Sequence, residues 1–218
     1  MTTVTVTVDG IETGVAPGAT VLEAAQAAGR DVPTLCFDDR QAPFGACRVC
    51  LVGVETPTGT ATIPACTTPC RDGMVVDTQD PKARRIAANV VELVLSELPE
   101  PPGDHTELAA VADHFGVGAP RWTGAVHQPR EEPSHPYLAL RHELCISCGR
   151  CVRACDEVQG AFALTATGRG FEANVTAGLD AGFEDSTCVS CGACADTCPT
   201  DAIAEVALLR LLEPEPAR

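Results

Sequence analysis

Twelve of the 13 cysteines in this chain fall into three groups of four, and their spacing is that of metal ligands. Residues 145–155 and 188–198 each follow the pattern C-x2-C-x2-C-x3-C. Thiolates at this spacing are typical of a pair of [4Fe–4S] clusters, because three thiolates on one tight loop reach three irons of the same cubane. The two runs therefore predict iron–sulfur chemistry, which is one-electron transfer.

The fourth cysteine of each run lies one helical turn beyond the third and points toward the other cluster. One [4Fe–4S] cluster is therefore predicted on Cys145, Cys148, Cys151 and Cys198. The other is predicted on Cys155, Cys188, Cys191 and Cys194. The alternative is a pair of zinc knuckles, but zinc sites usually combine two short cysteine pairs, or cysteine with histidine, around one metal. Two matched runs of four cysteines fit that pattern poorly.

A third group lies near the N-terminus with the spacing C-x10-C-x2-C-x15-C, and its members are Cys36, Cys47, Cys50 and Cys66. Four cysteines hold one [2Fe–2S] cluster, although the plant-type spacing C-x4-C-x2-C has a shorter first gap. The small residues Gly45 and Ala46 before the central pair suit backbone N–H bonds to a cluster. Four thiolates also satisfy a single zinc ion, so zinc stays open as the alternative for this group.

The elements before this group indicate how it is positioned. Residues 3–8 alternate Thr and Val, as in a strand with one buried face. Asp9-Gly10 is a strong hairpin signal, and a second strand is expected at about 11–15. Thr20 and Glu23 form a capping box that opens a helix to about Ala28. Further strands are expected at about 49–55, 60–63 and 74–77. A hairpin followed by a helix that crosses it predicts a small β-grasp domain.

The remaining chain predicts helices from Pro81 and over 106–116, and an extended linker over 119–136. After the linker we expect a strand at 137–140, a hairpin over 161–175 and a helix from Asp201 to Leu212. We expect Trp122 to anchor in a crevice, and His127 and His135 to be surface or linker residues. The fold class is thus α+β, with three parts: a β-grasp [2Fe–2S] domain (1–79), a helical connector (80–136) and a two-cluster [4Fe–4S] module with a C-terminal helix (137–218).

Composition narrows the functional classes. The 30 acidic and 15 basic residues give a net charge of −15, which disfavours nucleic-acid binding because phosphates require a basic face. No run approaches the roughly 18 apolar residues of a membrane span, and the N-terminal residues do not read as a secretory signal. Reduced thiols then favour a cytoplasmic location. The thirteenth cysteine, Cys70, is expected to be a buried inert thiol, with an alternative ligand role left open.

The motifs resemble a known family. Gly45-Ala-Cys-Arg-Val-Cys50 and Pro64-Ala-Cys66 are similar to the N-terminal region of the large peripheral iron–sulfur subunit of respiratory complex I. They are equally similar to the diaphorase-type iron–sulfur subunit of NAD-reducing [NiFe] hydrogenases. The same region begins the catalytic subunit of NAD-linked formate dehydrogenases and some [FeFe] hydrogenases, and the run from Cys145 to Gly160 matches the two-cluster module of the latter two groups. The resemblance covers about residues 3–205.

One departure from that family concerns cluster number. Relatives carry a His followed by three Cys in the connector, which bind an additional [4Fe–4S] cluster, whereas this chain has no Cys between Cys70 and Cys145. By the resemblance, Thr106 occupies the place of the last of these cysteines. His105 and His114 are expected at helix surfaces rather than as ligands. Three clusters are therefore expected, with a site completed by a partner subunit as the alternative.

The resemblance implies an electron-transfer iron–sulfur subunit of a cytoplasmic NAD(H)-linked oxidoreductase, without catalytic residues of its own. Its expected partners are a flavin-containing, NADH-binding subunit, which would hold FMN and NAD, and a catalytic subunit. The catalytic subunit would be a nickel–iron hydrogenase, which is favoured, or a molybdenum formate dehydrogenase. The alternatives are a free-standing multi-cluster ferredoxin that acts as a soluble carrier and, more weakly, a redox or metal sensor.

Overall fold

The computed structural model describes residues 3–122, 124–130, 132 and 134–212. The chain divides into two compact units. The first comprises Met1–Phe37, Pro43–Leu95 and Ala110–Trp122, and the second comprises Asp38–Ala42, Ser96–Ala109 and Thr123–Arg218. The short segment Asp38–Ala42 therefore belongs to the second unit, although the chain on both sides of it belongs to the first.

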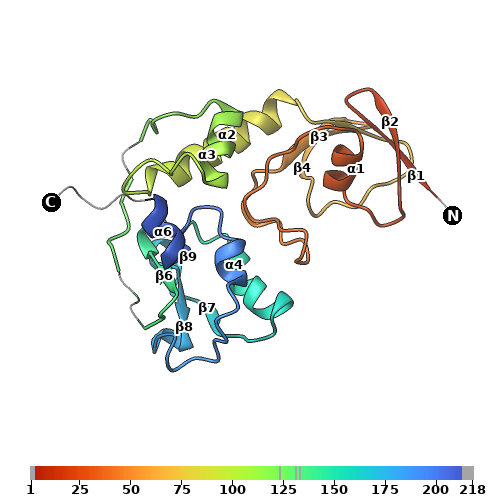
Figure 1. Ribbon diagram of the computed structural model, residues 1–218. Coiled ribbons are helices and arrows are strands. Elements are labelled where there is room, and N and C mark those ends of the chain that lie inside the picture. The colour runs from red at the N-terminus through yellow and green to blue at the C-terminus, as the bar shows by residue number, and fades with distance from the viewer. Residues whose placement is uncertain (1–2, 123, 131, 133, 213–218) are drawn as a thin grey trace. The chain divides into compact units, whose positions relative to one another are not determined.

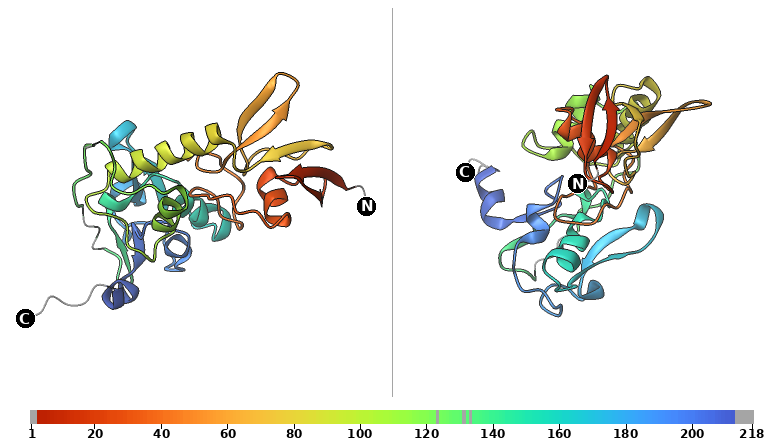
Figure 2. Two further views of the ribbon diagram at one scale, coloured as in Figure 1. Left: turned by 90° about the horizontal axis from the view of Figure 1, so that it is seen from above. Right: turned by 90° about the vertical axis from the view of Figure 1, so that its right-hand side faces the viewer.

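The first unit is built on a five-stranded mixed sheet (Figure 1). Its strands are β1 (Val4–Val8), β2 (Ile11–Val15), β3 (Leu51–Thr56), β4 (Gly59–Pro64) and β5 (Met74–Asp77), in the order β2-β1-β5-β3-β4. β1 and β5 are parallel, and the other pairs are antiparallel. Two hairpins thus flank β5 (Figure 2), and this arrangement is the expected β-grasp.

The local signals at the start of the chain are confirmed. Asp9 and Gly10 have φ values of 50° and 82°, the left-handed pair that a two-residue hairpin requires. Helix α1 (Val21–Ala27) begins with the predicted capping box, in which Glu23 N donates to Thr20 Oγ1 and Thr20 N donates to the Glu23 carboxylate. Gly29, with φ +68°, follows the end of the helix, where a left-handed residue closes the last turn.

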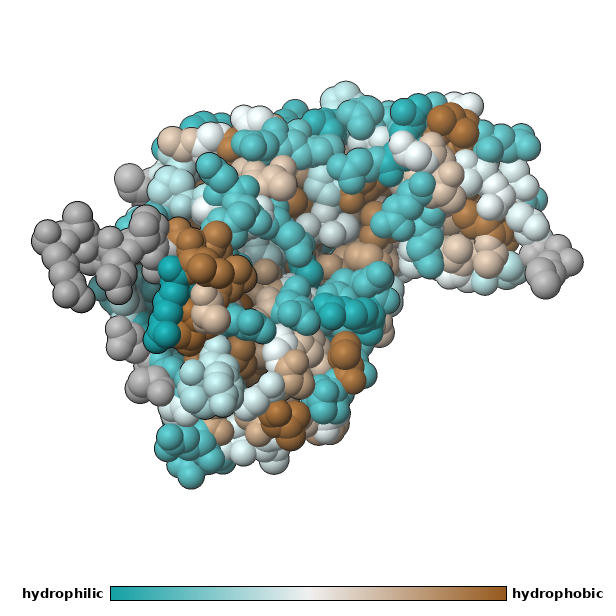
Figure 3. Space-filling model, viewed as in Figure 1, coloured by the Kyte–Doolittle hydropathy of each residue, from teal (hydrophilic) through white to brown (hydrophobic). Residues whose placement is uncertain are grey.

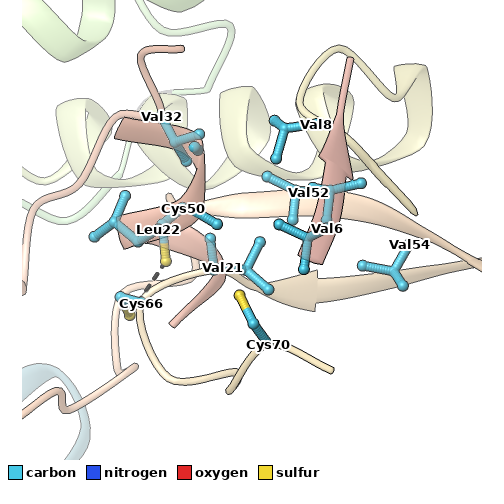
Figure 4. Packing of buried hydrophobic residues seen from close by; sticks show 14 of the residues in the cluster. Val6, Val8, Val21, Leu22, Val32, Cys50, Val52, Val54, Cys66 and Cys70 are labelled. Atoms are coloured by element: carbon cyan, nitrogen blue, oxygen red, sulfur yellow. Dashed lines mark hydrogen bonds between the residues drawn. The ribbon is translucent and has the colours of Figure 1, made fainter. Parts of the chain in front are cut away.

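The core of the first unit lies between α1 and the sheet (Figure 4). Val6 and Val8 from β1 and Val21 from α1 are fully buried, and Val52 from β3 completes the contact. Each such side chain contributes about 1.5–3 kcal/mol by leaving water. Three of the four N-terminal cysteines, Cys36, Cys50 and Cys66, are buried as well, so the packing that stabilises the sheet also holds the thiols.

Two longer helices follow the sheet. α2 (Pro81–Ser96) begins at the predicted proline, and the Asp80 carboxylate accepts a hydrogen bond from Ala83 N at 2.8 Å. α3 (Glu107–Phe115) confirms the helix expected over 106–116. None of the helices in the described part of the chain has the length and apolar character needed to cross a membrane.

The second unit contains two small antiparallel sheets. β6 (Leu138–Leu140) pairs with β9 (Ile203–Glu205), and β7 (Leu164–Thr167) pairs with β8 (Asn174–Ala177). The expected hairpin after residue 161 is thus confirmed, although it extends to Ala177. Helices α4 (Arg150–Arg153), α5 (Ala193–Asp196) and α6 (Val206–Leu212) complete the unit, together with a π turn at Ala154–Val158 and three 3₁₀ turns at His142–Leu144, Gly170–Glu172 and Gly178–Asp180.

Two expectations were wrong, and a third holds only in part. The helix predicted over 201–212 begins only at Val206, because Ile203–Glu205 form a strand that pairs with β6. His135 lies in the linker, as expected, but it is buried rather than at the surface. Trp122 is 43% exposed and lies against the Arg121 guanidinium at 4.7 Å from its ring centre, so it does not fill a crevice. Each of these differences depends on which residues pack together in the folded chain. A local sequence pattern does not determine that packing.

Candidate iron–sulfur sites

The second unit contains two cavities that are each lined by four cysteines. The first is lined by Cys145, Cys148, Cys151 and Cys198. The remaining lining is almost entirely apolar and includes Leu140, Val175 and Ile203. The structure thus brings together the four thiols that spacing assigned to one cluster.

The second cavity is lined by Cys155, Cys188, Cys191 and Cys194. Apolar side chains of Leu138, Leu164 and Phe183 form much of the remaining wall. Cys155 follows the first run of cysteines but lies with the second, and Cys198 does the reverse. This exchange is the arrangement expected of a two-cluster module, in which the fourth cysteine of each run serves the other cluster.

The two runs fold alike, which explains why both cavities have the same construction. Ser147 and Ser190 have φ values of 52° and 57°, and Gly149 and Gly192 have φ values of 77° and 79°. Each glycine begins the short helix that carries the third cysteine of its run. These left-handed residues curl each loop tightly, so that the first three cysteines of a run line the same cavity.

The electrostatics of these cavities suit a positively charged occupant. Burial raises the pKa of Cys148 to about 12 and that of Cys194 to about 12. Burial also raises the pKa of Cys151 well above its usual value. A buried thiolate is therefore costly unless a cation lies beside it, and the irons of a cluster supply that charge. Four thiols in the wall of a largely apolar cavity thus fit a [4Fe–4S] cluster.

The four N-terminal cysteines gather in the first unit as two pairs. Cys47 N donates to Cys36 Sγ at 3.4 Å, and Cys50 Sγ donates to Cys66 Sγ at 3.3 Å (Figure 4). The hydrogen bond from the Cys47 side chain lowers the pKa of Cys36 to about 5 and raises that of Cys47. Two iron atoms that each take two thiolates fit this pairing.

The loop between Cys36 and Cys47 supplies backbone donors to these thiols. The amides of Ala46 and Cys47 face Cys36, and that of Gly45 faces Cys66. Gly45 has φ +66°, and a Cβ there would meet Thr67 Cγ2 at 2.8 Å. A glycine is therefore needed for the loop to approach the thiols, as expected for a site whose sulfurs accept amide hydrogen bonds.

The connector holds no comparable group of thiols. His105 Nε2 lies 2.6 Å from Asp201 Oδ2, and His114 Nε2 lies 3.3 Å from the Arg84 guanidinium. Within the described residues, no three His, Cys, Asp or Glu side chains are arranged to hold a single metal ion. Thr106 instead begins α3: its Oγ1 accepts from Ala109 N at 3.2 Å and donates to Gly103 O at 2.8 Å.

The thirteenth cysteine lies in the core of the first unit. Cys70 is 7% exposed, and burial raises its pKa (Figure 4). The residue that the sequence did not single out is Arg150, which lies buried between two of the predicted ligands. The only signal for it in the sequence was a difference between the two runs, Gly149-Arg150 in the first and Gly192-Ala193 in the second.

Comparisons with known proteins agree with this architecture. Residues 1–81 match the family described as "2Fe-2S iron-sulfur cluster binding domain", and residues 144–202 match "4Fe-4S dicluster domain". The fold and the grouped thiols thus define a multi-cluster iron–sulfur protein. The chain is 33% identical over 215 residues to the HndD protein of the NADP-reducing hydrogenase of Solidesulfovibrio fructosivorans, covering 94% of this chain and 36% of that one. It is 35% identical over 208 residues to a component of an NADH-quinone oxidoreductase of Rhizobium meliloti, covering 91% of this chain and 23% of that one.

A solved structure matches over most of both chains. The chain aligns to a crystal structure of NAD+-reducing [NiFe]-hydrogenase in the H2-reduced state with a TM-score of 0.84 and 30% identity. The alignment covers 94% of this chain and 88% of that one. The chain therefore belongs to the same family as the matched chain of the NAD+-reducing [NiFe]-hydrogenase, and it contains a [2Fe–2S] domain and a [4Fe–4S] dicluster domain.

Proposed function

We propose that this protein is the electron-transfer subunit of an NAD(H)-linked oxidoreductase complex. It would carry single electrons between a flavin-containing subunit that binds NADH and a separate catalytic subunit. The observation that supports this most directly is the grouping of eight cysteines around two apolar cavities, four to each. The expected cofactors are one [2Fe–2S] and two [4Fe–4S] clusters, with FMN and NAD in the partner.

The proposed ligands are the twelve cysteines of the three groups. Cys36, Cys47, Cys50 and Cys66 would hold the [2Fe–2S] cluster. Cys145, Cys148, Cys151 and Cys198 would hold one [4Fe–4S] cluster, and Cys155, Cys188, Cys191 and Cys194 the other. Bound clusters supply the one-electron chemistry.

The chain's own residues hold the thiolates, exclude water and supply charge. Apolar walls such as Leu140 and Ile203 keep the first cavity dry, and a low local dielectric strengthens the influence of each nearby charge and hydrogen bond on a cluster's potential. Cys191 is exposed, so the second site lies nearer to solvent at that ligand. No catalytic residue is proposed.

A hydrogenase is the favoured catalytic partner, and a molybdenum formate dehydrogenase is the next choice. The support is the match to the hydrogenase structure, because the alignment covers 88% of the hydrogenase chain. The curated relatives are much longer than this chain, which spans 36% and 23% of the two described above. We propose a cytoplasmic location for the complex.

The test is to purify the protein from its native host under anaerobic conditions and to measure what accompanies it. We expect a fixed stoichiometry with a flavoprotein, FMN in the preparation, nickel rather than molybdenum, and reduced-state signals in electron paramagnetic resonance. A chain that purifies alone with its clusters intact would instead support the free ferredoxin. A colourless, zinc-loaded protein would overturn the proposal.

A further inference from the structure

The first four-cysteine cavity has a buried positive charge beside it. Arg150 begins α4 between Cys148 and Cys151, and only 6% of its side chain is exposed. Burial raises the pKa of the Cys148 thiol, and the nearby charge of Arg150 acts in the opposite direction, in favour of the thiolate. A buried arginine requires partners, because an unpaired cation in the interior is costly.

The partners of Arg150 come from three separate parts of the second unit. Its Nη1 and Nη2 atoms donate to the two carboxylate oxygens of Glu107 at 2.5 and 3.0 Å. Its Nε donates to Thr197 Oγ1 at 2.9 Å, and the Thr197 hydroxyl donates to the Asp38 carboxylate at 2.6 Å. Thr197 directly precedes the proposed ligand Cys198, so the network adjoins the first site on two sides.

Asp38 is only a minor counter-charge for Arg150, because it pairs mainly with Arg40. Its carboxylate lies 3.8 Å from the Arg150 guanidinium, but only 2.8 Å from that of Arg40. Arg40 donates to both Asp38 oxygens, and this hydrogen bonding holds the pKa of Asp38 well below its usual range. Glu107 is thus the main counter-charge of Arg150, and its own side chain is 49% exposed.

The second cavity lacks this cation. The two runs superimpose in sequence and in backbone conformation, and the position equivalent to Arg150 is Ala193, the first residue of α5. The two sites are therefore alike in ligands and in apolar walls but differ in charge at this place. The runs also differ at Arg153 and its equivalent Asp196, but Arg153 is paired with Glu157, whose Oε1 lies 2.9 Å from its Nε. Because reduction of a cluster adds one negative charge, a buried cation nearby favours the reduced form.

We propose that Arg150 sets the order of potentials in the pair: it makes the first [4Fe–4S] site easier to reduce than the second, while Glu107 limits the size of the effect. This inference rests on the ligand sets proposed above. Arg150 acts through its position and charge, and it is not a ligand. Electrons that enter the module would therefore reside preferentially on the first site.

The test compares two variants that should shift the midpoint potential of one cluster in opposite directions. Each variant is measured as the purified holoprotein. Arg150→Gln removes the cation, and we expect the midpoint potential of one [4Fe–4S] cluster to fall, so that its reduced-to-oxidised ratio at fixed solution potential drops about tenfold, or 59 mV for one electron. Glu107→Gln leaves the cation with less compensation, and the same cluster should become easier to reduce. Arg150→Lys should retain most of the wild-type difference.

The readout is a redox titration followed by electron paramagnetic resonance, with iron counted in every variant. The signal that shifts should be the one that changes in Cys148→Ser, not the one that changes in Cys191→Ser. Arg210→Gln, which removes an exposed charge from α6 of the same unit, serves as the control and should shift neither cluster, because solvent and salt screen it.

Shifts of equal sign in Arg150→Gln and Glu107→Gln would overturn the inference, because a purely structural network loses packing in both. Unchanged potentials with full iron would overturn it as well. If Arg150→Gln does not assemble its clusters, Glu107→Gln decides by the sign of its shift. A wild-type protein without two cubane signals would instead contradict the proposed ligand sets, so the two failures are distinguishable.

Discussion

Cys155 and Cys151 are close in the sequence, but their side chains lie in different sites. Cys155 follows Cys151 by one turn, yet the two thiols line different cavities. Ala163 N donates to Cys155 Sγ at 3.2 Å, which fixes the thiol in the second cavity. This placement agrees with the ligand role that we propose for Cys155 in the second site.

Replacing Cys155 by Ser should disturb the second [4Fe–4S] cluster and leave the first intact. The expected result is a loss of up to about four irons per chain, with the signal that disappears matching the one lost in Cys188→Ser. The measurement is iron content together with electron paramagnetic resonance. Loss of the signal assigned by Cys145→Ser would instead show that the ligands do not exchange between runs.

His135 is a buried histidine held in its neutral form. Its Nδ1 accepts hydrogen bonds from the amides of Tyr137 and Leu138 at 3.1 and 2.9 Å, and its Nε2 lies 3.2 Å from Ser190 Oγ. The rings of Tyr137 and Phe183 stand edge-on to it. Burial lowers the pKa of His135, because a charged imidazole would lose both amide hydrogen bonds and gain no counter-charge.

Stability should therefore decrease at acidic pH. The folded pKa of His135 lies below its unfolded value of about 6.5, so the unfolded chain binds the proton more readily. The contribution is complete above about pH 6.5 and is lost as the pH falls toward the folded pKa. Denaturant unfolding at about pH 7.5 and about pH 5.5 should show a smaller loss in His135→Asn, which keeps an acceptor near the Nδ1 position.

The control for this measurement is His127→Asn, a change in the same connecting segment, where the imidazole stacks on Phe171. Its acid loss should equal that of the wild type, because His135 is unchanged. An equal acid loss in His135→Asn would contradict the explanation. His142, whose pKa burial also lowers, accounts for acid sensitivity that remains.

Helix α3 folds in a connector that contains no cysteine. Thr106 caps its first turn, Leu108 N donates to Pro199 O at 3.0 Å, and Glu107 pairs with Arg150. Ordinary hydrogen bonds and an ion pair thus attach this segment to the four-cysteine module within the second unit. A helix cap and an ion pair stabilise the scaffold without metal.

Thr106→Ala should lower the free energy of unfolding by about 1 kcal/mol, the typical cost of removing a capping hydroxyl. Thr106 is 6% exposed, so its hydroxyl is poorly replaced by water. Thr106→Ser keeps the hydroxyl and should retain most of the stability. Denaturant unfolding followed by circular dichroism and by cluster absorbance measures both, and equal losses in the two variants would contradict the capping role.

Helix α6 presents a hydrophobic surface on the second unit (Figure 3). Leu208, Leu211 and Leu212 are 46%, 82% and 41% exposed. A surface of this kind is typical of proteins that associate.

The protein as a whole should hold about ten irons per chain, from one [2Fe–2S] and two [4Fe–4S] clusters. Iron and acid-labile sulfide analysis of anaerobically purified protein measures this number. About fourteen irons would require a further cubane and would contradict the three-cluster expectation. Chelation of iron should also unfold the second unit, because metal-binding energy contributes to folding and its cavities have eight thiols in their walls.

Local patterns predicted most of the architecture because the relevant physics is local. The hairpin at Asp9-Gly10 and the capping box of Thr20 depend on a few adjacent residues, and both are confirmed. The grouping of the cysteines was likewise predictable, since spacing within a run decides which thiols share a loop. The lack of cysteines between Cys70 and Cys145 can likewise be read directly from the sequence.

Tertiary structure alone revealed the surroundings of these local features. Three of these features depend on residues that are distant in the chain. They are the strand pairing of Ile203, the burial of His135 and the ion pair between Arg150 and Glu107. Whether a histidine is neutral, or a cation raises a cluster's potential, depends on burial and on partners in space. Ligands are therefore readable from adjacent residues, whereas the electrostatics that distinguish one site from the other require the fold.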